Sequence, residues 1–155
     1  MDKSDIKIIP FQKATAEHYH LMLMADPSKT IVKSYLPRSY KFELVADAKL
    51  LGLVLLIDTR PETIEIVNLA VAEEFQNSGY GEKLVHFALH WAQKNHYHTV
   101  EIGTGSTSFA QLYLYQKCGF RVVSIDRDFF VDNYHEPIIE NKLVLKDMIR
   151  LKKQL

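Results

Sequence analysis

Six consecutive residues, Gln76 to Gly81, have the types and spacing that suit the binding of an anion. They read QNSGYG and lie between a strand-forming run, TIEIVNLAV, and an apolar helical segment, GEKLVHFALHWAQ. The first four N–H groups of a helix have no partner within it, and the helix dipole adds positive charge there. Gly79 and Gly81 let the backbone approach an oxygen-rich ligand closely, and small Asn77 and Ser78 keep the turn open. A pyrophosphate fits this description, and an ordinary strand-to-helix turn is the alternative.

Glu65 is the candidate general base of the sequence. It lies with Asn68 in IEIVNLAV, a run that is otherwise apolar on both faces of the expected strand. A polar group in such a strand costs free energy unless it is satisfied. Partial burial raises the pKa of a carboxyl group toward the range in which it can accept a proton. The alternative is that the strand ends early, which leaves Glu65 solvated near the turn DTRPE.

Two known phosphate-binding motifs match the sequence poorly. A P-loop needs a lysine directly after its last glycine, whereas Gly81 is followed by Glu82 and Lys83. Downstream, EIGTGSTS supplies Gly103, Gly105 and Ser108 after an expected strand, with Asp126 about 20 residues further on. This pattern is a degraded dinucleotide fingerprint, because Ser108 stands where the third glycine belongs. A dinucleotide-binding enzyme therefore remains an alternative reading.

Alternating strand and helix patterns surround these residues. Strands are predicted at residues 6–9, in the hairpin YKFELVA and KLLGLVLLI that turns at Asp47-Ala48, and at 63–71, TVEIGT, FRVVSIDRDFF and KLVLKDMIRL. Helices are predicted at residues 15–24, at 79–96 with Leu84, Val85, Ala88 and Trp91 on the buried face, and in FAQLYLYQKC. A further short helix is expected to start with Asp26 as N-cap and Pro27 at the first helical position, and to end before Pro37. These elements indicate a mixed α/β protein.

Composition excludes several classes of function. The chain has 155 residues, 47% of them hydrophobic, which suits one domain spanning 1–155. The 19 basic and 19 acidic residues cancel, so no overall field favours nucleic acid or an anionic membrane. Cys118 is the single cysteine, the start MDKSDIK lacks the apolar stretch of a signal peptide, and no apolar run reaches the 18 or so residues of a membrane span. We therefore expect a cytoplasmic protein without disulfides.

The loop and a second segment together resemble a known family. QNSGYG matches the Q/R-x-x-G-x-G/A loop of the GNAT superfamily of N-acetyltransferases, and LYQKCGF at residues 114–120 resembles that family's second motif. Both occur in the expected order, and the resemblance is tight over about residues 63–130. The stretches TRPETIEIVNLAV, LYQKCGF and DMIRL are similar to a bacterial branch of mostly uncharacterised acetyltransferases. The resemblance implies a mixed, mostly antiparallel sheet of about seven strands flanked by about four helices. It also implies that strands four and five splay apart.

The resemblance further implies a site for acetyl-CoA as co-substrate, with no metal. Backbone around Leu69, Ala70 and Val71 would pair with the pantetheine arm, and N–H groups from Gln76, Asn77, Ser78, Gly79, Tyr80 and Gly81 would hold the pyrophosphate. The splay is commonly produced by a bulge in strand four, expected here near Asn68. The family often has an asparagine just before the second-motif helix, where this chain offers Ser106, Thr107 and Ser108. Ser106 and Ser108 are therefore the coenzyme contacts expected there.

Catalytic roles follow from the same resemblance. Glu65 occupies the position of the catalytic glutamate in the histone-acetylating branch, and the motif position of Tyr115 implies an acid beside the coenzyme sulfur. Acetyl transfer to a primary amine by direct attack is the first hypothesis, and a non-catalytic acyl-CoA-binding module is the second. Tyr113 is expected to pack, and Cys118 to be a core residue. The pair His86 and His90 lacks the glutamate of a zinc motif.

The acceptor is expected to be a small cationic amine or a lysine-like protein side chain. Acceptor pockets of the family use the loop between the last two strands, which reads DRDFFVDNYHEPIIEN in this chain. Carboxylates and aromatic rings attract cations. The carboxylates of this loop are Asp126, Asp128, Asp132, Glu136 and Glu140, its aromatic residues are Phe129, Phe130 and Tyr134, and Arg127 is its one arginine or lysine. The alternative is a solvated, simply charged hairpin. The segment PIIENKLVLKDMIRL resembles subunit-pairing surfaces of the family, so a homodimer is expected.

Overall fold

A seven-stranded sheet forms the centre of the molecule, in the order β1-β2-β3-β4-β5-β9-β6. The computed structural model describes residues 5–155. The strands are β1 (Ile6–Pro10), β2 (Tyr40–Ala46), β3 (Lys49–Arg60), β4 (Thr63–Val71), β5 (Thr99–Gly105), β6 (Arg121–Asp126) and β9 (Met148–Gln154). All neighbours pair antiparallel except β4 and β5, which are parallel. The expected fold class and strand number are therefore confirmed.

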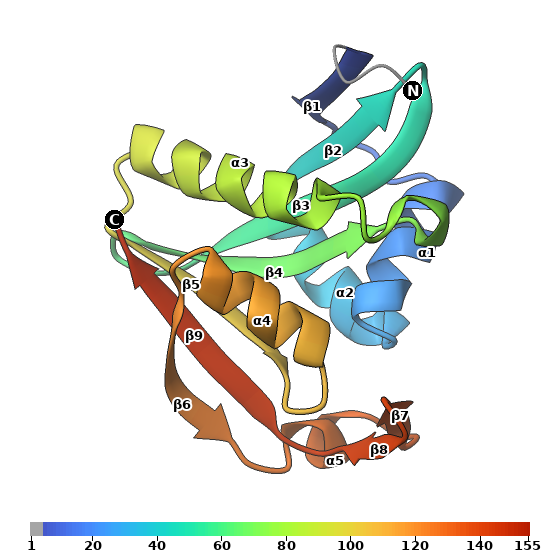
Figure 1. The fold of residues 1–155 in the computed structure, drawn as a ribbon, viewed down its shortest axis with the longest axis vertical. Coiled ribbons are helices and arrows are strands. Elements are labelled where there is room, and N and C mark those ends of the chain that lie inside the picture. The colour runs from blue at the N-terminus through green and yellow to red at the C-terminus, as the bar shows by residue number, and fades with distance from the viewer. Residues whose placement is uncertain (1–4) are drawn as a thin grey trace.

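Helices cover both faces of the sheet (Figure 1). They are α1 (Ala16–Ala25), α2 (Lys29–Tyr35), α3 (Tyr80–Lys94), α4 (Phe109–Lys117) and the short α5 (Phe129–Asn133), with 3₁₀ turns η2 (Leu36–Arg38) and η3 (Glu73–Phe75). Ile64 and Ile66 of β4 pack with Leu84 of α3 on one face, whereas Leu53 and Leu55 of β3 pack under α1 and α2 on the other. The central strands are buried on both faces for this reason.

The sheet divides where β4 and β5 part. Their parallel pairing runs from Thr63–Thr99 to Ile66–Ile102 and then ends, although both strands continue. On its other edge β4 carries a bulge, because Leu55 pairs with Asn68 and Leu56 with Ile66, which leaves Val67 as the extra residue. The expected bulge near Asn68 is present. Figure 1 shows the two strands diverging, with β1–β4 in one half and β5, β9 and β6 in the other.

The helix after Pro27 begins differently from the expectation. Ser28, not Asp26, is the N-cap of α2, because its side chain accepts from the Ile31 N–H at 3.2 Å. The Asp26 Oδ1 instead accepts from the Ser28 N–H at 3.2 Å. Asp26 was a wrong choice of cap, because its carboxylate accepts from the Ser28 N–H before the helix and from the hydroxyls of Tyr35 and Tyr134, which are distant in sequence.

The C-terminal segment is more broken than the sequence patterns suggested. The expected strand FRVVSIDRDFF ends at Asp126 and gives way to α5, and the expected last strand divides into β8 (Leu143–Leu145) and β9. β8 pairs with β7 (Ile138–Glu140) in a separate two-stranded sheet. Within residues 5–155 no helix is long and apolar enough to cross a membrane.

Candidate active site

The loop before α3 leaves the start of that helix open. Gly79 is the N-cap with φ +87°, a left-handed conformation, and no side chain of residues 5–155 caps the helix. Asn77 also has a positive φ, of +61°. Gln76 fixes the loop to the end of β4, since its Nε2 donates to the Val71 carbonyl at 2.9 Å. Free N–H groups at the head of a fifteen-residue helix make this loop a seat for an anion.

A cavity of about 460 Å³ extends from this loop along β4, and we call it the loop cavity. It includes most of the residues expected to bind coenzyme, whereas Ser78 is not in its lining. The expected residues that line it are Leu69, Ala70, Val71, Gln76, Asn77, Gly79, Tyr80, Gly81 and Tyr115.

A second cavity, also of about 460 Å³, fills the gap between the diverging strands, and we call it the sheet cavity. Its walls include Ile66 to Leu69 of β4 and Ile102 to Gly105 of β5. Both cavities are lined by Leu69, Tyr115, Met24, Ala25 and Gln111. A ligand in the loop cavity and a ligand in the sheet cavity therefore meet at these residues.

Tyr115 lies at that junction. Its side chain is 5% exposed and contacts the Phe120 ring edge to face, with the centroids 6.2 Å apart. Burial, and to a lesser degree the nearby Cys118, raises the pKa of the Tyr115 phenol well above its ordinary value of 10. The hydroxyl therefore keeps its proton and remains a hydrogen-bond donor at neutral pH.

Glu65 lies on β4 before the strands separate. It alternates with Ile64 and Ile66, which pack under α3, so its side chain projects to the opposite face of the sheet. Burial is the main cause that raises the pKa of its carboxyl above the ordinary value of 4.5, and the negative charge of Glu101 raises this pKa further. The positive charges of Arg150 and Arg38 lower the pKa and so reduce the shift. Glu65 lines neither cavity. The structure therefore brings Tyr115, but not Glu65, to the point where the cavities meet.

Asn68 belongs to a buried polar network that sequence reasoning did not foresee. Its Nδ2 donates to the Met22 carbonyl and to the Tyr35 hydroxyl, both at 3.0 Å. Tyr35 in turn donates to Asp26 Oδ2 at 3.1 Å, and Tyr134 donates to Asp26 Oδ1 at 2.8 Å. Burial is the main cause that raises the pKa of both phenols, so each remains a donor to the carboxylate. The polar Asn68 within an apolar strand was the available sequence signal.

The glycines of the dinucleotide fingerprint serve packing instead. A Cβ on Gly105 would lie 2.5 Å from Leu145 Cδ1, and one on Gly103 would lie 2.6 Å from Met148 Sδ. Ser108 lines the sheet cavity and donates to Glu140 Oε2 at 2.7 Å. Ser106 lines neither cavity, and its N–H donates to the Asp147 carbonyl at 2.9 Å. Side chains of β8 and β9 therefore pack closely against both glycines, which also line the sheet cavity.

The acidic C-terminal segment contributes less to the sheet cavity than its sequence suggested. Asp126 Oδ2 accepts from Arg150 Nε and Nη2, both at 2.6 Å, and is thereby neutralised. The remaining acidic and aromatic residues divide into those that line the cavity, Phe130, Tyr134 and Glu140, and those that do not, Asp128, Phe129, Asp132 and Glu136. Asp26, from the other end of the chain, lines it as well.

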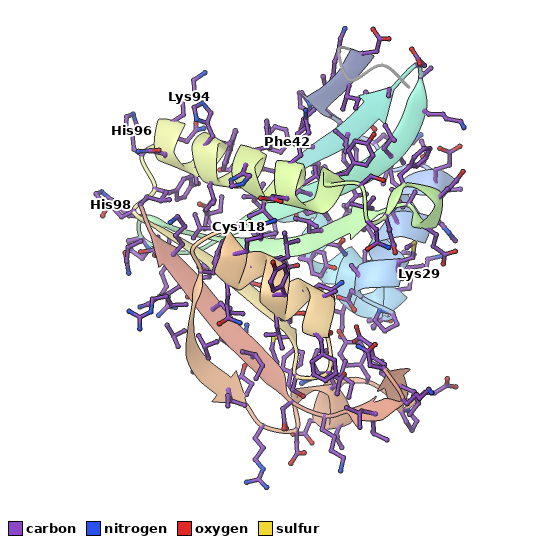
Figure 2. The ribbon with its side chains drawn as sticks, viewed as in Figure 1. Lys29, Phe42, Lys94, His96, His98 and Cys118 are labelled. Atoms are coloured by element: carbon purple, nitrogen blue, oxygen red, sulfur yellow. The ribbon has the colours of Figure 1, made fainter. Side chains whose placement is uncertain are left out.

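Tyr113 lies within α4, and Cys118 is the residue that caps the C-terminal end of this helix. Tyr113 is 70% exposed and lines the loop cavity, so the expectation of a packing residue is wrong. Cys118 is buried between α3 and α4 (Figure 2). One ligand atom each from Cys118, Glu82 and His86 lies within 4.8 Å of the others, but Glu82 already pairs with Lys117 at 3.1 Å. The expectation that the protein holds no metal stays a prediction.

Comparison with known proteins identifies the family. The acetyltransferase (GNAT) family model matches residues 11–120. A relative from Bacillus subtilis (strain 168), the uncharacterised N-acetyltransferase YvbK, is 46% identical over 151 residues, which are 97% of each chain. A crystal structure of a Bacillus subtilis acetyltransferase in complex with CoA is 47% identical, with a TM-score of 0.93 over 97% of this chain and 99% of that chain.

Two further solved structures are similarly close. A GNAT family acetyltransferase from Elizabethkingia anophelis with acetyl-CoA bound is 42% identical, with a TM-score of 0.94 over 99% of this chain and 100% of that chain. An IAA acetyltransferase from Bacillus cereus ATCC 14579 is also 42% identical, with a TM-score of 0.92 over 97% of this chain and 99% of that chain. The chain described here belongs to the acetyltransferase (GNAT) family and is an acetyltransferase enzyme.

Proposed function

We propose that the protein transfers the acetyl group of acetyl-CoA directly to the primary amine of a small cationic acceptor. The observation that carries the proposal is the junction of the two cavities at Tyr115 and Leu69. One cavity begins at an uncapped helix N-terminus suited to a pyrophosphate, and the other contains carboxylates suited to a cation. The two substrates can therefore be bound at once with their reacting groups adjacent.

Acetyl-CoA occupies the loop cavity in this proposal. N–H groups of the Gln76–Gly81 loop hold the pyrophosphate. Beyond Ile66, β4 has no strand partner among residues 5–155 on the side of β5, so its backbone around Leu69 to Val71, apart from the Val71 carbonyl that Gln76 contacts, is open to hydrogen bonds with the pantetheine amides. Two close relatives, solved in complex with CoA and with acetyl-CoA, support this assignment.

The chemistry is a direct displacement on the thioester. The amine nitrogen forms a bond to the acetyl carbon, and the carbon–sulfur bond then breaks to release CoA as a thiolate. Because its pKa is raised, the Tyr115 hydroxyl acts by donating a hydrogen bond to the sulfur as negative charge develops there. Before attack, the ammonium form of the acceptor loses one proton to the Glu65 carboxylate through water, since Glu65 lines neither cavity, and the free amine is the nucleophile. The second proton, which the nitrogen loses as the amide forms, goes through solvent to the CoA thiolate.

The charge of the sheet cavity supports a cationic acceptor. Asp26 and Glu140 line it, and no Lys, Arg or His of residues 5–155 does. The aromatic rings of Phe130 and Tyr134 line it too, and ring faces attract ammonium groups by about 0.5 to 2 kcal/mol each. A neutral or anionic acceptor gains nothing from these groups.

A homodimer forms part of the proposal, although β9 cannot pair edge to edge with a second copy because it lies between β5 and β6 within the sheet. Apolar side chains are exposed instead on the edge strand β6 and on the β7–β8 hairpin; they are Val122, Val123, Ile125, Ile139, Leu143 and Val144. Exposed apolar groups on an edge strand favour association with a second copy. Light scattering should give the mass of a dimer at micromolar concentration, and the mass of a monomer would reject this part.

Glu65→Gln tests the base through pH. A raised pKa means that the wild-type carboxylate is protonated, and inactive as a base, as pH falls through that value. We expect the ratio of wild-type to variant kcat/KM to be about 100 or more at high pH and to approach one at low pH. Since the ionisation of the amine itself affects both enzymes equally, the ratio isolates Glu65. A ratio that does not change with pH would exclude Glu65 as the base.

The same variant has an independent signature in stability. The Glu65 carboxyl has a higher pKa in the folded state than in the unfolded state, so its protonated form stabilises the folded protein. This contribution to the free energy of unfolding is complete below the ordinary pKa of 4.5 and is lost as pH rises through the raised, folded-state pKa. Wild type therefore loses stability over this window and Glu65→Gln does not. The difference in the free energy of unfolding, measured in urea, should move in favour of the variant as pH increases.

The acceptor is tested by thiol release from acetyl-CoA with a panel of polyamines, amino sugars, lysine-like amines and neutral and acidic amines. Cationic amines should react fastest, and Asp26→Asn should raise their KM about tenfold, equivalent to ~1.4 kcal/mol, with the KM of acetyl-CoA unchanged. Gly79→Val is the control for the coenzyme site. A side chain is strained at the Gly79 φ of +87°, and its Cβ would enter the open space of the loop, so this variant should weaken acetyl-CoA binding. Faster reaction of acidic amines, or no release with any amine, would refute the proposed acceptor.

A further inference from the structure

The amide oxygen of Asn68 is buried without a hydrogen-bond donor among residues 5–155. The residue is 3% exposed, so bulk solvent does not provide the donor. Unsatisfied buried acceptors are rare in native proteins because they cost free energy, and their explanations include strain, a functional role, and a bound water or ion. Because Asn68 lines the sheet cavity, a donor for its oxygen can come from a water or a ligand that enters that cavity.

The orientation of this amide follows from its neighbours. Its Nδ2 lies 3.0 Å from the Met22 carbonyl, which can only accept a hydrogen bond. The second Nδ2 proton is directed at the Tyr35 hydroxyl, whose own proton goes to Asp26. Exchanging the nitrogen and oxygen would place two acceptors together at Met22. The oxygen is therefore the atom left without a partner.

The location of Asn68 connects this oxygen with the reaction. Asn68 belongs to the β4 bulge and lines the sheet cavity. The next residue, Leu69, lines both cavities together with Tyr115. A donor that reaches Asn68 from the sheet cavity is thus close to the point where the acetyl group would be presented.

The network behind Asn68 makes its oxygen a better acceptor for a cation. Asn68 donates to Tyr35, and Tyr35 donates to the Asp26 carboxylate. Hydrogen bonds in such a chain polarise one another, so negative charge is transmitted from the carboxylate toward the amide oxygen. An ammonium or amine N–H gains more from this oxygen than from an isolated amide.

We propose that Asn68 Oδ1 accepts a hydrogen bond from an N–H of the attacking amine and thereby orients its nitrogen toward the acetyl carbon. This inference rests on the proposed function, and it adds a requirement: the acceptor nitrogen keeps one N–H for Asn68 while its lone pair attacks. A primary amine satisfies both demands. Asn68 is a residue that binds the acceptor, and Tyr35 and Asp26 position it.

Asn68→Ala and the matched variant Tyr35→Phe separate this role from a structural one. Both remove hydrogen bonds of the network, but Tyr35→Phe leaves the Asn68 oxygen in place. With n-butylamine as the probe, Asn68→Ala should raise the amine KM at least tenfold and Tyr35→Phe only a few-fold. The dissociation constant of acetyl-CoA should not change in either variant. An equal effect of the two variants, or an unchanged amine KM in Asn68→Ala, would overturn the inference.

A test on the wild-type enzyme does not depend on whether the variants fold. N,N-dimethylbutylamine, protonated at neutral pH, has one N–H, whereas N,N,N-trimethylbutylammonium has the same charge and none. We expect the dimethyl compound to inhibit acetylation of n-butylamine at least tenfold more strongly. Equal inhibition would mean that charge alone is recognised and would overturn the role of Asn68. Failure of every amine to react would instead overturn the proposed function and this inference with it.

Discussion

The early end of the pairing between β4 and β5 is the constraint on which the rest of this structure depends. The two strands form four parallel pairs and then separate after Ile66 and Ile102. The bulge at Val67 changes the direction of β4 at the same place and moves Asn68 onto the side of Tyr35 and Met22. Separated strands create the sheet cavity and leave one backbone edge of β4 without a strand partner in the described part of the chain, residues 5–155. If β4 and β5 paired along their whole length, the sheet cavity would close and the backbone edge of β4 would be occupied.

The open end of the sheet is held by polar contacts between segments far apart in the chain. Asp26, between α1 and α2, accepts hydrogen bonds from Tyr35 and from Tyr134, which lies 108 residues further on. On the opposite wall, Ser108 donates to Glu140, and Asn141 donates to the Thr107 carbonyl at 2.7 Å. The segment from α5 to β8 is therefore tied to both halves of the divided sheet. These contacts set the size and the negative charge of the cavity together.

Local patterns predicted the elements and the loop well. β4 has the expected bounds, because the strand-forming run ends at a turn on both sides, and α3 starts directly after Gly79, whose left-handed φ suits glycine as the N-cap. The patterns failed where a partner is distant in sequence. Asp26 has the residue type of a helix cap, but its carboxylate accepts a hydrogen bond from Tyr134. Asp126 has the residue type of a cation-binding residue, but its charge is balanced by the ion pair with Arg150. The prediction for Tyr113 was wrong for a different reason, because the helical period of the sequence does not show that a cavity lies beside the face of α4 that carries Tyr113.

The account centres on the joining of the two cavities at Tyr115, and its most direct test is the turnover of Tyr115→Phe beside that of Tyr113→Phe. Both tyrosines lie on α4 and line the loop cavity, but only Tyr115 also lines the sheet cavity. With n-butylamine, Tyr115→Phe should reduce kcat about 100-fold or more, with the dissociation constant of acetyl-CoA unchanged, and Tyr113→Phe should keep wild-type kcat. Wild-type turnover in Tyr115→Phe between pH 6 and pH 9 would contradict the account.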